Sequence, residues 1–296
     1  MDFGYEIPNL SRFRVNFYNQ KNGIGAVFRQ IPSHVLSFED FKKLDAPMPD
    51  VLKKFTMLNR GLILVTGPTG SGKSTTLAAM VDHANANRKD HIITLEDPIE
   101  FVHQSKSCLV NHREIGLHTK SFAAGLRGAL REDPDIILVG EMRDLETIEL
   151  AISAAATGHL VFGTLHTQSA AKSVDRVIDV FPADQQNKIR QTLSEALKGI
   201  VAQTLFKRMD KKGRIAAFEI LVFNTAVANL VREGKTHQIQ GMIQVGKRIG
   251  NQPLDDNIME HVRMKRISPE EAYEKALDRK KFRPLLAHPP EDEDAI

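Results

Sequence analysis

One short stretch restricts the fold of this chain more than any other feature. Residues Gly67–Ser74 read Gly-Pro-Thr-Gly-Ser-Gly-Lys-Ser, which fits the pattern G-x-x-x-x-G-K-[ST]. An apolar run at Leu62–Thr66 precedes it, and a helical pattern at Ser74–Asn87 follows it. This strand–loop–helix context is the one that the pattern requires in phosphate-binding loops. We therefore expect an α/β fold in which the loop binds ATP.

The residue types of the loop suit that ligand. Glycines let backbone N–H groups point inward at phosphate oxygens, and the following helix adds its positive N-terminal end. Lys73 is expected to reach the β- and γ-phosphates, and the Ser74 hydroxyl to bind Mg²⁺. The predicted nucleotide-binding residues are Gly67, Pro68, Thr69, Gly70, Ser71, Gly72, Lys73, Ser74 and Thr75.

Strand-like and helix-like segments alternate after this loop. Strands are expected at His91–Leu95, Ile136–Val139 and Leu160–Thr164, and helices at Ser121–Arg131 and Leu145–Thr157. Such alternation predicts a mostly parallel sheet with helices on its faces. From Pro182 onward helical periodicity dominates, apart from a strand at Ile215–Val222.

The segment before the loop has a different character. Phe13–Tyr18 and Gly25–Arg29 flank a turn and predict a β-hairpin. Two strands alone are marginally stable, so we expect this hairpin to belong to a larger N-terminal domain. Pro32, Pro47 and Pro49 then predict a linker.

Composition excludes several classes of site. The formal net charge is +3, from 40 basic and 37 acidic residues, which is too balanced to favour nucleic acid as the main partner. The single cysteine, Cys108, excludes an internal disulfide and cysteine-pair zinc sites, and it favours a reducing cytoplasmic compartment. No apolar run approaches the roughly 20 residues that span a bilayer. We expect no direct membrane insertion, so any membrane association would come through partners.

An acidic residue follows the predicted strand Ile136–Val139. Most phosphate-loop enzymes place an Mg²⁺-binding Asp at the end of this strand. Here Gly140 occupies that position, and the acid follows as Glu141. Glu141 lies where α/β sheets bind ligands, so we expect it to polarise the attacking water or to support the water shell of the metal. A solvated acid at a strand end is the alternative.

Three more carboxylates, Glu96, Asp97 and Glu100, follow the predicted strand His91–Leu95. They could order Mg²⁺ and water, because hard cations favour oxygen ligands. Asp97 is the candidate metal ligand, and Glu96 or Glu100 is a candidate general base. Capping of a loop or helix is the alternative for each of them.

Two histidines, His159 and His166, flank the strand segment Leu160–Leu165. Each could contact the γ-phosphate, because a histidine donates hydrogen bonds and can carry charge. Opposite ends of a strand cannot place both rings on one metal ion. A purely structural role at the strand end is the alternative for each.

Arginines supplied by a neighbouring chain or domain can stabilise charge in phosphoryl transfer. Arg127 and Arg131 are spaced to share a helix face, and Arg12, Arg14 and Arg29 lie on the predicted hairpin. Surface salt bridges are the alternative interpretation, and for the hairpin arginines they are favoured when the sequence is taken alone.

Four motifs in this order resemble the Walker A, Asp box, Walker B and His box of secretion-superfamily ATPases. They are Gly67–Ser74, Leu95–Glu100, Leu138–Asp144 and Gly158–Thr167. Within that superfamily the chain most resembles the PilT-type retraction ATPases of bacterial type IV pili. The resemblance runs from about Phe13 to about Leu277.

The resemblance implies a RecA-like P-loop ATPase domain with a mostly parallel sheet, preceded by a truncated PAS-like N-terminal segment. The implied boundaries are 1–35 for a remnant of the PAS-like domain, 36–56 for a linker, 57–288 for the ATPase domain with its helical C-terminal part, and 289–296 for an acidic tail. It further implies a homohexameric motor at the cytoplasmic face of the inner membrane. Such a motor would act on a pilus platform protein and drive retraction and twitching motility.

The resemblance implies roles for the residues that match the motifs of the superfamily. Lys73 and Ser74 resemble the phosphate and Mg²⁺ residues, and Glu141 resembles the catalytic glutamate. The Asp box contains Glu96, Asp97 and Glu100, and the His box contains His159 and His166. The arginines that resemble phosphate-contacting arginines of the superfamily are Arg14, Arg29, Arg127 and Arg131.

Two features favour retraction over extension. Extension and type II secretion ATPases usually carry a four-cysteine metal-binding insertion, which one cysteine cannot form. The stretch 226–233, Ala-Val-Ala-Asn-Leu-Val-Arg-Glu, resembles a C-terminal helix motif of retraction ATPases, although Ala228 replaces the usual Arg.

Other functions remain open from the sequence. They are an accessory retraction paralogue, a related secretion or translocation ATPase, and a nucleotide-binding assembly module with little turnover. A nucleic-acid helicase is disfavoured, because the chain has no Trp and only three Tyr to stack on bases.

Overall fold

The computed structural model describes residues 2–8, 10–31 and 34–290. Its centre is a seven-stranded sheet with the order β10-β9-β4-β8-β7-β5-β6. All neighbouring strands pair in parallel except β9 and β10, which are antiparallel, so the predicted mostly parallel sheet is confirmed. The strands are β4 Gly61–Thr66, β5 His91–Glu96, β6 Leu109–Glu114, β7 Ile136–Val139, β8 Leu160–Leu165, β9 Leu197–Lys207 and β10 Arg214–Val222.

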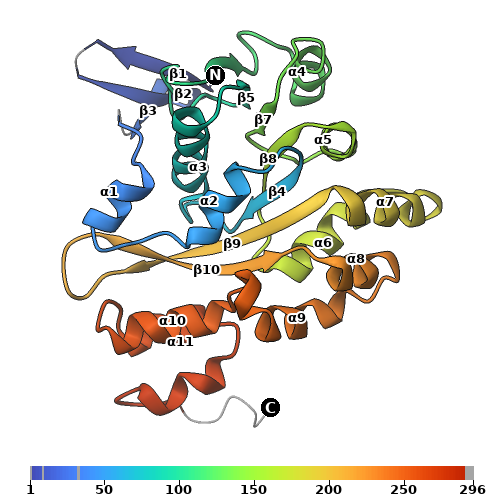
Figure 1. Cartoon of the computed structure of the whole chain (residues 1–296). Helices are drawn as coiled ribbons and strands as arrows, with labels where there is room; N and C mark the ends of the chain where they lie inside the picture. Colours follow the sequence, from blue (N-terminus) through green and yellow to red (C-terminus); the bar gives the residue numbers. More distant parts are fainter. Residues whose placement is uncertain (1, 9, 32–33, 291–296) are drawn as a thin grey trace.

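Helices cover both faces of this sheet (Figure 1). Strands β4, β7 and β8 are buried along their whole length, because their continuous apolar runs face helices on both sides. Leu126, Ile152 and Leu193 belong to the core on one face, and Leu52, Leu77 and Met80 to the core on the other. The helices that follow the central strands are α3 Lys73–Asn87, α4 Phe122–Ala129, α5 Leu145–Thr157, α6 Ala170–Asp179 and α7 Ala183–Ala196.

The strands predicted from the central apolar runs and the three helices between them are all present. The sequence did not indicate β6 or β9. In β6 the run Leu-Val-Asn-His-Arg-Glu is mostly polar, because this strand lies at the edge of the sheet. In β9 the apolar residues continue directly from the end of α7 with no intervening turn, so helical periodicity hid the change of element.

The C-terminal part is helical and packs on β10 and β9 (Figure 1). Phe206, Ile215 and Phe282 belong to a third core cluster there. The helices are α8 Thr225–Arg232, α9 Ile239–Val245, α10 Leu254–Arg263 and α11 Pro269–Lys275. The acidic tail predicted at 289–296 falls mostly outside the described residues.

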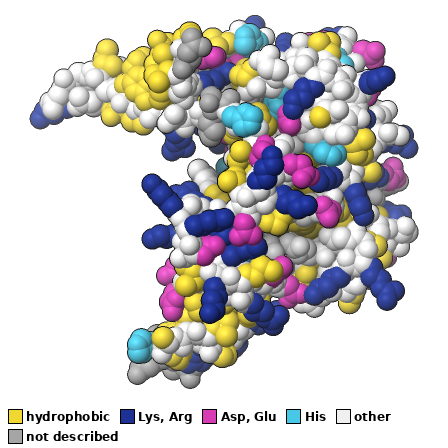
Figure 2. Space-filling view, turned by 60° about the vertical axis from the view of Figure 1, so that its left-hand side comes forward, with side chains coloured by type: hydrophobic (Ala, Val, Ile, Leu, Met, Phe, Trp, Pro, Cys, Tyr) yellow, Lys and Arg dark blue, Asp and Glu magenta, His cyan; other side chains and the backbone are white. Residues whose placement is uncertain are grey.

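The N-terminal segment forms a small antiparallel sheet with the order β1-β2-β3, so the predicted hairpin is extended by a strand that the sequence did not indicate. Its bounds are β1 Asp2–Ile7, β2 Ser11–Gln20 and β3 Gly23–Ile31. Figure 2 shows this sheet projecting at the upper left with apolar side chains gathered on it. Phe17, Ile24 and Phe28 of this sheet are exposed.

Residues 36–56, predicted as a linker, carry two short helices, α1 Phe38–Lys43 and α2 Asp50–Thr56. Phe38, Leu52 and Phe55 are buried in the core that covers α3. Between the helices, Asp45 accepts a 2.9 Å hydrogen bond at Oδ2 from Nη2 of Arg208, whose side chain is nearly fully buried. The segment is therefore packed on the sheet domain. Among the described residues, no helix is long and apolar enough to cross a membrane.

This packing makes α2 a part of the core. Leu52→Ala should lower the free energy of unfolding by about 2–5 kcal/mol, because it leaves a cavity at a fully buried site. Lys54 is exposed on the same helix and gives the control: Lys54→Ala should change the free energy of unfolding by less than about 0.5 kcal/mol. Urea denaturation measures both, and equal small effects would contradict the placement of α2.

Candidate active site

The phosphate-loop sequence connects β4 to α3, at the carboxyl edge of the sheet. Gly67 has φ of 144°, and a Cβ there would lie 2.4 Å from the backbone oxygen of Gln203, so only glycine fits. Gly72, in the left-handed conformation at φ 90°, precedes the first residue of α3. The backbone therefore enters the helix in the conformation that leaves its first N–H groups directed at the loop.

Lys73 begins α3 and reaches back across the loop. Its Nζ donates to the backbone oxygens of Gly67 at 2.9 Å and Pro68 at 3.2 Å. Burial lowers the pKa of Lys73, and the negative charges of Glu141 and Glu100 oppose that shift. Carboxylates from the ends of two other strands are thus close enough to act on the loop lysine.

Gln203 on β9 anchors the phosphate loop through hydrogen bonds of its side chain. Its Nε2 donates to the backbone oxygen of Ser71 at 2.5 Å, and its Oε1 accepts from Oγ1 of Thr76 at 2.7 Å. The side chain is almost fully buried. The sequence did not single out Gln203, since β9 was not predicted. The signal that it offered was an amide side chain directly after the apolar residues 200–202.

Glu141 lies just beyond the carboxyl end of β7. Its Oε1 accepts a 2.7 Å hydrogen bond from Nε2 of His166 and an ion-paired hydrogen bond from Arg143. A Cβ at Gly140 would lie 3.0 Å from the backbone oxygen of Leu95, so β5 leaves no easy room for a side chain there. The close approach of the two strands explains why the acid follows at position 141.

The loop that carries His166 is fixed from β10. The carboxylate of Glu219, buried, accepts a 2.7 Å hydrogen bond from the backbone N–H of Ala170 at the start of α6. Burial raises the pKa of Glu219. Ser173 Oγ lies 2.6 Å from Oγ1 of Thr167, next to His166. These contacts hold the end of β8 against the helix that follows it.

The Asp-box residues form a compact loop after β5. Glu96 Oε2 accepts from the backbone N–H of Glu100 at 3.3 Å, so part of its role is loop capping. Asp97 is exposed. Within the described part of the chain, no three His, Cys, Asp or Glu side chains converge as a metal site.

Three predicted residues do not join this group within the chain. His159 lies before β8, and the six strand residues, at about 3.3 Å each, separate it from His166 by roughly 20 Å. Its Nδ1 lies 3.0 Å from the backbone oxygen of Ala154. Arg127 and Arg131 are exposed on and just after α4, and Arg127 pairs with Glu146 of α5.

Arg14 and Arg29 lie side by side on neighbouring strands of the N-terminal sheet. They are directly paired in register on β2 and β3, and therefore share one face of it. Two residues before Arg14, Arg12 pairs with Glu114 at the end of β6. That contact places the sheet at the same carboxyl edge as the phosphate loop.

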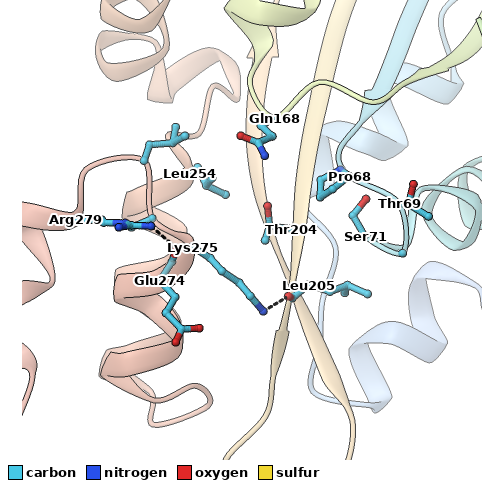
Figure 3. Close-up of a pocket in the computed structure, with 13 residues that line it drawn as sticks. Pro68, Thr69, Ser71, Gln168, Thr204, Leu205, Leu254, Glu274, Lys275 and Arg279 are labelled. Atoms are coloured by element: carbon cyan, nitrogen blue, oxygen red, sulfur yellow. Dashed lines mark hydrogen bonds between the residues drawn. The ribbon is translucent and has the colours of Figure 1, made fainter. Parts of the chain in front are cut away.

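A pocket of about 490 Å³ lies beside the loop. Figure 3 shows Pro68, Thr69 and Ser71 on one side of it, and Glu274, Lys275 and Arg279 on the other. Lys275 Nζ donates to the backbone oxygen of Leu205 at 3.1 Å, which ties α11 to β9 across the pocket. The cavity is large enough for a nucleoside next to the loop.

A family model described as "Type II/IV secretion system protein" matches residues 4–270. The chain belongs to this family.

The most similar relatives include pilus proteins. The type IV pilus retraction ATPase PilT of Pseudomonas aeruginosa is 56% identical over 93% of this chain and 78% of its own length. A twitching motility protein of Neisseria gonorrhoeae is 55% identical over 93% of this chain and 72% of its own length. A crystal structure of the pilus retraction motor PilT with bound ADP aligns with a TM-score of 0.86 at 44% identity, covering 95% of this chain and 78% of that one.

The anchoring role of Gln203 can be tested directly. Gln203→Ala removes the donor to Ser71 and the acceptor for Thr76, so we expect nucleotide affinity to fall about ten-fold, equivalent to about 1.4 kcal/mol. Binding of a fluorescent ATP analogue measures this. Gln191→Ala, at an exposed position of α7, should leave affinity unchanged. A folded Gln203→Ala protein with wild-type affinity would refute the role.

Proposed function

We propose that this chain is a Mg²⁺-dependent ATPase of a hexameric motor that powers type IV pilus retraction and twitching motility. The observation that carries the proposal is the position of Glu141: it lies at a strand end on the sheet edge that also carries the phosphate loop, and it is hydrogen-bonded to His166. An acid held so can orient and polarise a water for attack on the γ-phosphate.

The chain supplies the parts for this reaction from one edge of its sheet. The loop 67–74 would bind the phosphates through its backbone, and Lys73 would leave the carbonyls of Gly67 and Pro68 to meet the β- and γ-phosphates. Glu141 would take a proton from the attacking water, with His166 fixing the carboxylate. Glu96 and Glu100 would order further water beside it.

The residues present fit Mg²⁺. Ser74, in the first turn of α3, offers a hard oxygen ligand next to the phosphate site, and Asp97 lies in the acidic loop after β5. Bound Mg²⁺ would neutralise charge on the phosphates. The remaining ligands would be phosphate oxygens and water.

The wider assembly is part of the same proposal. The domain 57–288 would be RecA-like, and the N-terminal sheet within 1–35 would be PAS-like. Arg14 and Arg29 would contact phosphates from that sheet, while His159, Arg127 and Arg131 would act across a contact between subunits. The hexamer would stand at the cytoplasmic face of the inner membrane and act on a pilus platform protein. The names of the relatives and the shared family support this assignment.

Water activation gives the first test. Glu141→Gln keeps the size of the side chain and removes its basicity, so kcat should fall at least about 100-fold. ATP binding should persist, because the loop is intact. Phosphate release under saturating ATP and Mg²⁺ measures the rate. Arg143→Gln, which removes the exposed partner of Glu141, is the matched comparison, and its kcat should fall far less. Turnover of Glu141→Gln at the wild-type rate would contradict the mechanism.

Retraction needs a separate test in cells. Expression in a pilus-bearing strain that lacks its retraction ATPase should restore twitching, whereas Glu141→Gln should not. Hydrolysis in vitro without restored twitching would favour an accessory paralogue or a related translocation motor. Tight ATP binding without phosphate release would favour an assembly module.

A further inference from the structure

Glu114, the last residue of β6, is a buried carboxylate shared by two parts of the molecule. Its Oε2 accepts a 3.0 Å hydrogen bond from the backbone N–H of Ile99, and the same oxygen lies 3.4 Å from Nη2 of Arg12. Only 4% of the Glu114 side chain is exposed. A charge so far from water needs compensation, and Arg12 is the cation that supplies it.

Arg12 belongs to the face of the N-terminal sheet that carries the other arginines. Arg12 and Arg14 are two residues apart on β2, so both side chains leave the same face, and Arg29 opposes Arg14 on that face. The Arg12 guanidinium also lies against Gly4 of β1, where a Cβ would come within 2.8 Å of Nη2. Arg12 thus attaches this arginine face, rather than the opposite one, to β6.

Ile99 lies inside the acidic loop, between Glu96 and Glu100. Its backbone N–H is held by Glu114, and the loop is closed by the hydrogen bond from the N–H of Glu100 to Glu96. Burial lowers the pKa of Lys73, and the negative charge of Glu100 is one of the two that oppose this shift. The position of the acidic loop beside the phosphate loop therefore depends on the same oxygen that binds Arg12.

We propose that the Arg12–Glu114 ion pair is a positioning contact that couples the arginine face of the N-terminal sheet to the acidic loop of the active site. The inference rests on the proposed ATPase function. With the pair formed, Arg14 and Arg29 are held at the carboxyl edge of the main sheet, where charge develops during phosphoryl transfer. With the pair broken, the sheet loses its charged attachment, although the phosphate loop itself is untouched.

The consequence is a separation of turnover from binding. Arg12→Gln and Glu114→Gln should each lower kcat for ATP by about ten-fold or more, because small misplacements of charged groups are costly in the transition state. The KM for ATP and the Kd for ADP should change by less than about three-fold, because Lys73 and the loop backbone remain. Glu114→Gln keeps an oxygen that accepts from Ile99, so it tests the ion pair rather than the loop anchor.

A double-mutant cycle decides whether the two residues act through one contact. The Arg12→Gln/Glu114→Gln protein should be no slower than either single variant, and Arg12→Lys should recover part of the rate. Arg113→Gln is the matched control: Arg113 is the residue before Glu114 on β6, and its replacement breaks the ion pair with Glu132, which lies after α4, so kcat should stay unchanged.

The outcomes separate this inference from the function on which it rests. A wild-type protein without phosphate release refutes the ATPase function. If the wild type is active, two results overturn the coupling. One is a folded Glu114→Gln variant with unchanged kcat, and the other is additive effects of the two substitutions in the double variant. Thermal unfolding identifies folded variants, and Glu114→Gln alone decides the question if Arg12→Gln does not fold.

Discussion

The burial of β4 on both faces is the constraint on which the rest of the structure depends. Its apolar side chains are removed from water by α3 with α2 on one side and by α5 on the other, so the chain must wind helices onto both faces. Parallel pairing with β8 and β9 then directs the carboxyl ends of the central strands to one edge. The phosphate loop, the acidic loop, Glu141 and His166 all follow strands that end there.

Buried charges attach the outlying segments to this sheet. Arg208 binds Asp45 and so fixes the turn between α1 and α2 against the β9–β10 hairpin. Its hydrogen bonds lower the pKa of Asp210 to about 2. Glu219 caps α6, and Glu114 holds both the acidic loop and Arg12. In each case a side chain removed from water requires particular polar partners, and this requirement fixes relative positions that apolar packing alone would leave free to shift.

Much of the fold and part of the candidate site could be predicted because the signals were local. A run such as Leu62–Thr66 followed by the phosphate-loop pattern specifies strand, turn and helix within a few residues of each other. His166 was recognisable because it directly follows the apolar strand β8, and Glu141 because it follows the apolar strand β7 after Gly140. The strand β6 and the anchor Gln203 were not recognisable, because an edge strand is polar and a helix that runs straight into a strand shows no turn.

The sequence by itself determined the α/β class, the phosphate loop and the acids that end the strands, since each depends on spacing along a single segment. Only the tertiary structure decided which of these side chains meet. It packed the expected linker into the core through Leu52, and it brought Arg12 to Glu114 across about a hundred residues. Contacts of that kind depend on strand order and on compensation of buried charge, and neither leaves a periodic trace in a sequence.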